Sequence, residues 1–268
     1  MRTRFAPSPT GWLHLGHAYA ARVAWEEARR EGGEFLLRLE DIDSTRCRPE
    51  YETAIFEDLT RLGLMWTGPV WRQSERMLYY QAALEKLQAM GVVYPCFCTR
   101  QEIASLSAPQ GPEGPLYPGT CKSISKAQCR EMLESGRTYA WRLDAAHASR
   151  MAGKLAWEDL ERGTFCVMPE LLGDVVLARK DIATSYHLAV TVDDAAQEIS
   201  MVTRGEDLLA STHVHRLLQA LLALPVPRWK HHKLICDETG KRLAKRDDAR
   251  SLRSLWKSGW NSGELWSL

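Results

Sequence analysis

The chain has 268 residues, of which 45% are hydrophobic and 26% are charged, and its formal net charge at neutral pH is +1. This length and composition predict a folded protein of one large or two modest domains and exclude extended disorder. Such a small net charge gives no sign of a nucleic-acid partner by itself. No apolar run reaches the roughly 18 residues of a membrane-spanning helix, and the N-terminus lacks a signal-peptide core. We therefore expect a cytoplasmic protein without membrane association.

The first seventeen residues, MRTRFAPSPTGWLHLGH, predict a strand, a loop and the start of a helix. Arg2–Ala6 is typical of a short strand, the prolines and glycine at 7–11 prevent regular structure, and a helix is expected from Leu13 onward. A helix N-terminus offers unpaired backbone N–H groups and the positive end of its dipole. The segment therefore predicts an anion site.

Two histidines lie in the first turn of that helix. His14 and His17 are three residues apart, so they share one face. Gly16 between them leaves room for a flat ring to approach. We expect a nucleotide whose phosphates lie against the two imidazoles.

The segment after the first helix predicts a buried strand. The helix should end at the glycine pair 32–33, and Phe35–Leu39 is nearly all apolar, as expected in a parallel sheet. Strand, helix and strand in this order predict a βαβ unit. Ligands bind at the carboxyl ends of such strands, where Glu40 falls. Asp43 and Ser44 are expected instead to cap the next helix.

Helical periodicity continues at 49–62 and at 74–90, with Ser74 as the expected N-cap of the second helix. Farther along, residues 125–135 predict a helix, and 138–144 and 173–179 predict strands.

A cysteine-bearing segment follows these first helices. The chain has seven cysteines, an odd number, which argues against a disulfide framework. Cys96 and Cys98 form a C-x-C pair, and a Gly/Pro-rich stretch leads to Cys121. A metal would order that stretch, but three thiolates are one ligand short of a closed tetrahedral zinc site. The alternative is that these cysteines are small buried hydrophobes.

The last third of the chain predicts a second set of sheet and helix. Residues 199–202 predict a strand with Arg204 at its carboxyl end, while His213 and His215 are expected to be polar helix residues rather than metal ligands. The segment 228–257 has a local charge of +6, which suits polyphosphate but also a solvated face. The Trp-rich tail after residue 249 gives no clear prediction.

Four segments together resemble the class I aminoacyl-tRNA synthetases. HLGH at 14–17 resembles their HIGH motif, and RFAPSPTG at 4–11 is similar to the glutamyl and glutaminyl branch. RLEDID at 38–43 resembles R-[IL]-E-D-T-D of that branch. RLAKR at 242–246 is similar to the second class I motif, KMSKS, with Arg242 and Ala244 as departures.

The resemblance implies an α/β fold, a class I Rossmann-like parallel sheet with a zinc-bearing insertion between its two halves. It divides the chain into a first catalytic half at 1–93, the insertion at 94–180 facing nucleic acid, a second half at 181–226, and a basic loop region and tail at 227–268 with no anticodon-binding domain.

The resemblance also implies site residues for an ATP-dependent glutamate-activating ligase, with Mg²⁺ accompanying ATP. His14, His17 and Lys245 would be catalytic. ATP would lie against Pro7, Gly16, His17, Arg242, Leu243, Lys245 and Arg246. Glutamate would contact Arg4, Ala6, Ser8, Glu40, Tyr186 and Arg204, with Glu40 on its ammonium group and the two arginines as forks for its carboxylates.

Within this branch, the cysteine spacing is similar to that of glutamyl-queuosine tRNA(Asp) synthetases. These carry C-x-C followed by Y-x-x-x-C, which implies a structural zinc held by Cys96, Cys98, Tyr117 and Cys121, with Cys129 as the competing fourth ligand. The implied acceptor is the queuosine in the anticodon loop of tRNA(Asp), and we expect a monomer. Three alternatives stay open: a truncated glutamyl-tRNA synthetase charging tRNA(Glu), a non-catalytic RNA-binding relic, and a general nucleotidyltransferase.

Overall fold

The structure of the chain, a computed structural model, describes residues 1–105, 108–179, 183–235 and 251–266. The helices are α1 (Leu15–Arg30), α2 (Pro49–Arg61), α3 (Met77–Ala89), α4 (Arg100–Ser105), α5 (Lys126–Glu134), α6 (Ala145–Ala152), α7 (Tyr186–Ala196), α8 (Ser211–Leu221), α9 (Leu252–Lys257) and α10 (Ser262–Trp266), with the 3-10 turns η1 (Gln73–Arg76), η2 (Thr120–Lys122), η3 (Pro169–Leu171) and η4 (Glu206–Leu208). The strands are β1 (Arg2–Phe5), β2 (Glu34–Leu39), β3 (Trp71–Arg72), β4 (Val93–Cys96), β5 (Gln110–Gly111), β6 (Gly114–Pro115), β7 (Ala140–Leu143), β8 (Ala156–Asp159), β9 (Gly163–Cys166), β10 (Val176–Arg179), β11 (Met201–Gly205) and β12 (Arg228–His232).

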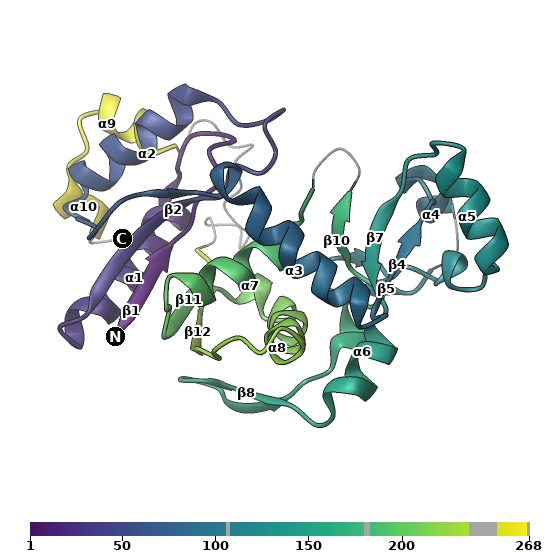
Figure 1. The fold of residues 1–268 in the computed structure, drawn as a ribbon. Coiled ribbons are helices and arrows are strands. Elements are labelled where there is room, and N and C mark those ends of the chain that lie inside the picture. The colour runs from purple at the N-terminus through teal and green to yellow at the C-terminus, as the bar shows by residue number, and fades with distance from the viewer. Residues whose placement is uncertain (106–107, 180–182, 236–250, 267–268) are drawn as a thin grey trace.

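Parallel strands form the centre of the molecule, as the sequence predicts. One parallel sheet has the order β1-β2-β3, and a second has β11-β12-β8 with β9 added antiparallel at its end. The two meet at β1 and β11, where the backbone N–H of Ser200 donates to the carbonyl oxygen of Arg2 at 3.0 Å. Residues almost 200 positions apart therefore lie side by side (Figure 1).

Small side chains let α1 lie close to the first sheet. Ala18, Ala21, Ala24 and Ala28 are all buried on the inner face of α1 and pack in the same core as the apolar residues of β2. The buried hydroxyl of Thr3 on β1 donates to the carbonyl oxygen of Ala24 at 2.8 Å. This close packing sets where α1 begins relative to the carboxyl ends of β1 and β2.

The predicted insertion is built around a separate antiparallel sheet. Its strands have the order β10-β7-β4, and the β5–β6 hairpin and α5 accompany it. Ser125 caps α5 in a reciprocal arrangement with Gln128, so the predicted helix is confirmed there. Strands β8 and β9, although within 94–180, belong instead to the second parallel sheet.

Two predicted helix caps are wrong. The helix α3 begins at Met77 after a 3-10 turn, and Ser74 instead bonds Asp41, with its hydroxyl donating at 2.6 Å. Arg48 precedes α2 without a side-chain cap, and Pro49 starts the helix. Asp43 accepts from the backbone and hydroxyl of Thr45 and caps no helix.

The tail forms helices that the sequence did not predict. Leu252 of α9 and Leu265 of α10 are buried in the core of the first sheet. The indole N–H of Trp256 donates to Asp58 on α2 at 2.7 Å, and the tail lies beside α2 in Figure 1. The backbone N–H of Leu252 donates to the carbonyl oxygen of Leu13 at 2.7 Å, so the tail also supports the start of α1.

Among the described helices, none combines the length and apolarity that crossing a membrane requires.

Candidate active site

The start of α1 is closed by the histidines of the HLGH segment. Nδ1 of His14 accepts the backbone N–H of Gly16 at 3.1 Å, and Nδ1 of His17 accepts the backbone N–H of His14 at 3.2 Å. The two side chains thus form a reciprocal capping box. Because Nδ1 is the acceptor in both rings, the proton of each neutral imidazole lies on Nε2. Both rings are therefore N–H donors at a helix N-terminus, which suits phosphate.

Gly16 allows the two rings to lie this close. A Cβ atom at Gly16 would be 3.0 Å from Cε1 of His14, and the ring centroids of His14 and His17 are 3.8 Å apart. Pro7 fixes the preceding loop, since its carbonyl oxygen accepts the backbone N–H of Glu40 at 3.0 Å. The other residues predicted for ATP, namely Arg242, Leu243, Lys245 and Arg246, lie outside the described residues.

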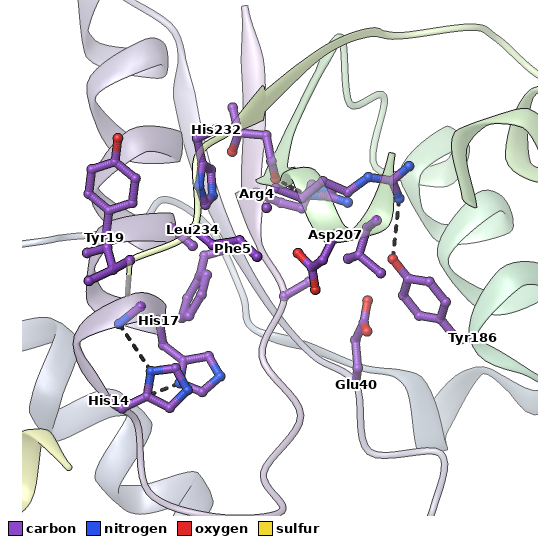
Figure 2. A pocket seen from close by; sticks show the side chains of 18 residues that line it. Arg4, Phe5, His14, His17, Tyr19, Glu40, Tyr186, Asp207, His232 and Leu234 are labelled. Atoms are coloured by element: carbon purple, nitrogen blue, oxygen red, sulfur yellow. Dashed lines mark hydrogen bonds between the residues drawn. The ribbon is translucent and has the colours of Figure 1, made fainter. Parts of the chain in front are cut away.

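A cavity of about 250 Å³ extends from this helix start across the carboxyl ends of the parallel strands. Figure 2 shows His14 and His17 at one end and Glu40 and Tyr186 at the other. The structure brings together most of the predicted binding residues as its lining: Arg4, Ala6, His14, Gly16, His17, Glu40, Tyr186 and Arg204. Ser8 lies behind them, and its hydroxyl donates to the carbonyl oxygen of Glu40 at 2.6 Å. Ser8 thereby fixes the backbone that carries Glu40.

Arg204, buried near the end of β11, is held by uncharged partners. Its Nε donates to Nε2 of His231 at 3.2 Å, and Nη1 contacts Nδ1 of His215 at 3.1 Å. Its Nη1 also donates to the hydroxyl of Tyr186 at 3.3 Å, and its Nη2 donates to the hydroxyl of Thr212 at 2.5 Å. Among the described residues, no carboxylate forms an ion pair with this guanidinium. A buried arginine without a carboxylate partner favours an anionic ligand.

Arg4 is different, because the protein already neutralises it. Its Nε and Nη2 donate to the two carboxylate oxygens of Asp194 on α7, at 2.9 and 3.3 Å. Burial raises the pKa of Asp194, but Arg4 and Arg38 outweigh this and hold that pKa below its usual range. Sequence reasoning missed Asp194, although the Asp-Asp pair in an otherwise apolar helix was a visible signal.

Glu40 lies between these two environments. It follows β2 directly, and Nη2 of Arg38 is 3.5 Å from its Oε1. Burial raises the pKa of Glu40, while Arg38 and Arg4 oppose that rise. A carboxylate whose charge is costly in the unliganded pocket is stabilised by a cationic ligand such as an ammonium group. Arg38 is a second residue that the sequence analysis did not single out.

The cysteine side chains also come together, and they form a second site. The sulfur atoms of Cys96, Cys98 and Cys121 lie within 4.8 Å of one another. Oη of Tyr117 is 3.5 Å from Sγ of Cys98, and it accepts the backbone N–H of Cys121 at 2.8 Å. The three thiols and a phenol are therefore grouped as the predicted spacing requires. Cys129, the alternative ligand, is not part of this cluster among the described residues.

The donor set fits a structural zinc ion in its chemistry. Burial raises the pKa of Tyr117 and raises that of Cys98 to about 11, so both groups hold their protons without a cation. The guanidinium carbon of Arg142 lies 4.1 Å from the ring centroid of Tyr117, and a positive charge at this position favours the phenolate form that a metal ion requires. Thiolates with one further ligand are a common zinc environment.

The fold is that of the class I synthetases, and comparison with known proteins agrees. Residues 1–265 match the family described as tRNA synthetases class I (E and Q), catalytic domain. The chain belongs to this family and is a ligase of the aminoacyl-tRNA synthetase type.

Among its relatives, the similarity is high to proteins named glutamyl-Q tRNA(Asp) synthetase. The chain is 48% identical to the one from Rhodobacter capsulatus, over 99% of this chain and 98% of that protein. It is 43% identical to the one from Nocardia farcinica, over 99% of this chain and 82% of that protein. A protein named glutamate–tRNA ligase 2 from Syntrophus aciditrophicus is 37% identical, and the match covers 54% of its length.

A solved structure supports the fold. The glutamate tRNA ligase of Elizabethkingia meningosepticum, determined in complex with its amino acid, superposes with a TM-score of 0.77 at 31% identity. The match covers 92% of this chain and 52% of that protein, so the chain spans about half the length of that synthetase.

Proposed function

We propose that the protein activates L-glutamate with ATP, without needing tRNA for this step. A glutamate carboxylate oxygen attacks the α-phosphorus of ATP, and the bond from that phosphorus to the bridging oxygen breaks. The products are glutamyl-adenylate and pyrophosphate. Charge builds on phosphate oxygens in the transition state, so positioned donors carry the rate.

The contrast between Arg204 and Glu40 within one cavity carries this proposal. Arg204 has no carboxylate partner among the described residues and so offers its positive charge to a ligand, and Glu40 offers a buried carboxylate for an ammonium group. An amino acid with a carboxylate at each end satisfies both. Arg204 supplies the positive charge for one carboxylate, whereas Arg4, paired with Asp194, adds N–H donors rather than net charge.

The nucleotide lies at the other end of the cavity. His14 and His17 donate their Nε2 protons to phosphate oxygens, with Pro7 and Gly16 shaping the loop beneath them. Lys245, with Arg242, Leu243 and Arg246, neutralises the leaving pyrophosphate, and Mg²⁺ accompanies ATP. This second set of residues rests on the resemblance of RLAKR alone.

The acceptor is proposed to be the queuosine nucleoside in the anticodon loop of tRNA(Asp). The name of the Rhodobacter capsulatus relative, and its match over nearly both full lengths, support this choice. The insertion at 94–180 would face the RNA, and one zinc ion held by Cys96, Cys98, Tyr117 and Cys121 would order it. The second candidate is charging of tRNA(Glu), which the similarity to glutamate–tRNA ligases favours.

The deciding experiment is ATP–pyrophosphate exchange with glutamate, glutamine and aspartate in the absence of tRNA. Exchange with glutamate alone supports the proposal, and exchange that requires tRNA contradicts it. Transfer is then measured with labelled glutamate on tRNA(Asp) bearing queuosine, the same tRNA lacking it, and tRNA(Glu). Label confined to the first supports the acceptor, while label on tRNA(Glu) favours the second candidate.

The zinc site has its own test. Elemental analysis of freshly purified protein should give about one equivalent of zinc, as expected for a single closed site. Cys98→Ala should release most of it, whereas Cys129→Ala should retain it. Zinc below about half an equivalent in the wild-type protein would contradict the assignment.

A further inference from the structure

Arg204 is a donor-only side chain, so it fixes the proton positions of the imidazoles around it. His231 must accept at Nε2, which places its proton on Nδ1, 2.7 Å from Oδ2 of Asp159. His215 must accept at Nδ1, which places its proton on Nε2. The Nε2–H of His215 then donates to Nδ1 of His187 at 3.2 Å. All three rings must be neutral for these contacts to exist.

The electrostatics agree with neutral rings. Burial, followed by the charge of Arg204, lowers the pKa of His231 to about 3 and that of His215 well below its ordinary value. Burial also lowers the pKa of His187, to about 4, although Glu113 opposes this. Near neutral pH the series of hydrogen bonds therefore runs in one direction, from His215 to His187. It ends at Nε2 of His187, which bears a proton.

The acid that faces this last proton comes from the insertion. Oε2 of Glu113 is 3.8 Å from Nε2 of His187, and Oε1 accepts the hydroxyl of Ser211, the first residue of α8. Glu113 lies in the turn between β5 and β6, inside the Gly/Pro-rich stretch that runs from Cys98 to Tyr117. It thus contacts α7 and α8, and α8 also carries Thr212 and His215.

The hairpin that presents Glu113 is closely packed. The backbone N–H of Leu116 donates to the carbonyl oxygen of Pro109 at 2.8 Å. A Cβ atom at Gly111 would be 2.5 Å from the side chain of Leu116 and 3.0 Å from the carbonyl oxygen of Leu171. Such packing holds Glu113 in a set position relative to the helices.

We infer that Glu113 is a positioning residue for the amino-acid site, acting on Arg204 through His187 and His215. The inference rests on the proposed activation of glutamate and extends it to the insertion. By accepting the hydroxyl of Ser211 at the start of α8 and by facing the Nε2 proton of His187, Glu113 keeps Nδ1 of His215 directed at Arg204. Cys98 and Tyr117, two of the predicted zinc ligands, flank the stretch of chain that carries Glu113. The cysteine-bearing segment is thereby connected to the glutamate pocket rather than to the nucleotide end.

The kinetic test uses the full-length protein in the exchange assay. Glu113→Ala should raise the KM for glutamate roughly fivefold to tenfold, about the effect of one lost hydrogen bond, and leave the KM for ATP and kcat within about twofold. Glu113→Gln should recover most of the loss, because its amide oxygen can still accept from Ser211. Glu134→Ala, at an exposed site on α5 in the same insertion, is the matched control and should behave as wild type.

A second measurement follows the rings themselves in protein labelled with ¹⁵N-histidine. Wild-type spectra should show protons on Nε2 of His187 and His215 and on Nδ1 of His231. Glu113→Ala should change the signals of His187 and His215 and leave His231 unchanged. An Nδ1 proton on wild-type His215, unaltered ring signals in Glu113→Ala, or equal increases in the KM for glutamate and ATP would overturn the inference. Absence of glutamate-dependent exchange in the wild type would instead refute the proposed function, and the ring signals would still decide the contact network.

Discussion

The two ends of the cavity are built in different ways. The two histidines at the nucleotide end come from one continuous segment and cap their own helix. The amino-acid end joins β1, β2, α7, α8, β11 and β12, which come from both halves of the chain. The position of the two histidines is therefore set mainly by local backbone geometry, with support from the tail at Leu13, and the amino-acid end depends on the two parallel sheets meeting correctly. A substitution at one end should leave the other intact.

The largest expected effect concerns the choice of amino acid. Glutamine would place a neutral amide against one of the two guanidinium groups, Arg4 or Arg204, which leaves a buried charge unpaired. Breaking such a pair costs on the order of 3–5 kcal/mol, or roughly 10²–10³-fold or more in kcat/KM. Exchange rates with glutamate and glutamine measure this directly. Comparable rates would show that the charge of Arg204 is balanced in another way.

The next effect isolates the nucleotide end. Lys245→Ala should reduce adenylate formation by roughly 10²–10³-fold, the usual loss for a group that acts on charge developing in the transition state. Glutamate affinity, measured by calorimetry, should not change, because the other end of the cavity is built separately. Lys241→Ala, in the same basic stretch, is the control and should lose much less. Equal losses in affinity and rate would contradict the division of the cavity into two ends.

A third effect is the pH dependence of stability that the buried histidines at the amino-acid end should produce. The folded-state pKa values of His231 and His187, about 3 and about 4, lie below their ordinary value of 6.5. Between pH 6.5 and these lowered values, the unfolded chain therefore binds more protons than the folded chain. The free energy of unfolding should then fall as pH decreases from about 6.5 towards 4. Each histidine contributes at most about 1.4 kcal/mol per pH unit.

Carboxyl groups with a raised pKa oppose this loss, and Glu40 and Asp58 are two of them. Burial raises the pKa of Asp58 to about 6, so the folded state binds the extra proton there, and stability rises as pH falls through that value. Urea unfolding from pH 8 to 4.5 measures the sum, and Asp58→Asn should make the decline on acidification steeper. Stability that is constant over this range in both proteins would contradict neutral, buried histidines at the amino-acid end.

The comparison also explains which parts of the site could be predicted. The HLGH segment and Glu40 follow from local order, because a strand, a loop and a helix start leave few choices of geometry. Asp194 and His231 escaped notice because each acts only through a contact with a residue far away in sequence. His215 was interpreted as a polar helix residue, since periodicity shows which face a residue occupies but not which arginine it meets.

Parts of the fold were predictable for the same physical reasons. The βαβ unit and the parallel sheets were predicted from apolar runs and glycine stops, and they are confirmed. The tail helices were not, because α9 and α10 span six and five residues and have little intrinsic stability. They form by packing Leu252 and Leu265 into an existing core. The cap at Ser74 failed because Asp41, from another loop, bonds its hydroxyl.

The smallest effect separates two roles of one residue at the nucleotide end. His14 caps α1 through Nδ1 and is proposed to donate to phosphate through Nε2. Asparagine can replace the cap but not that donor, and alanine can replace neither. Both variants should lose exchange activity, whereas only His14→Ala should lose stability, by about 1 kcal/mol. Thermal unfolding and exchange rates measured on the same samples check this. An asparagine variant with wild-type activity would show that the imidazole serves the helix alone, and that phosphate is held by the backbone of the loop.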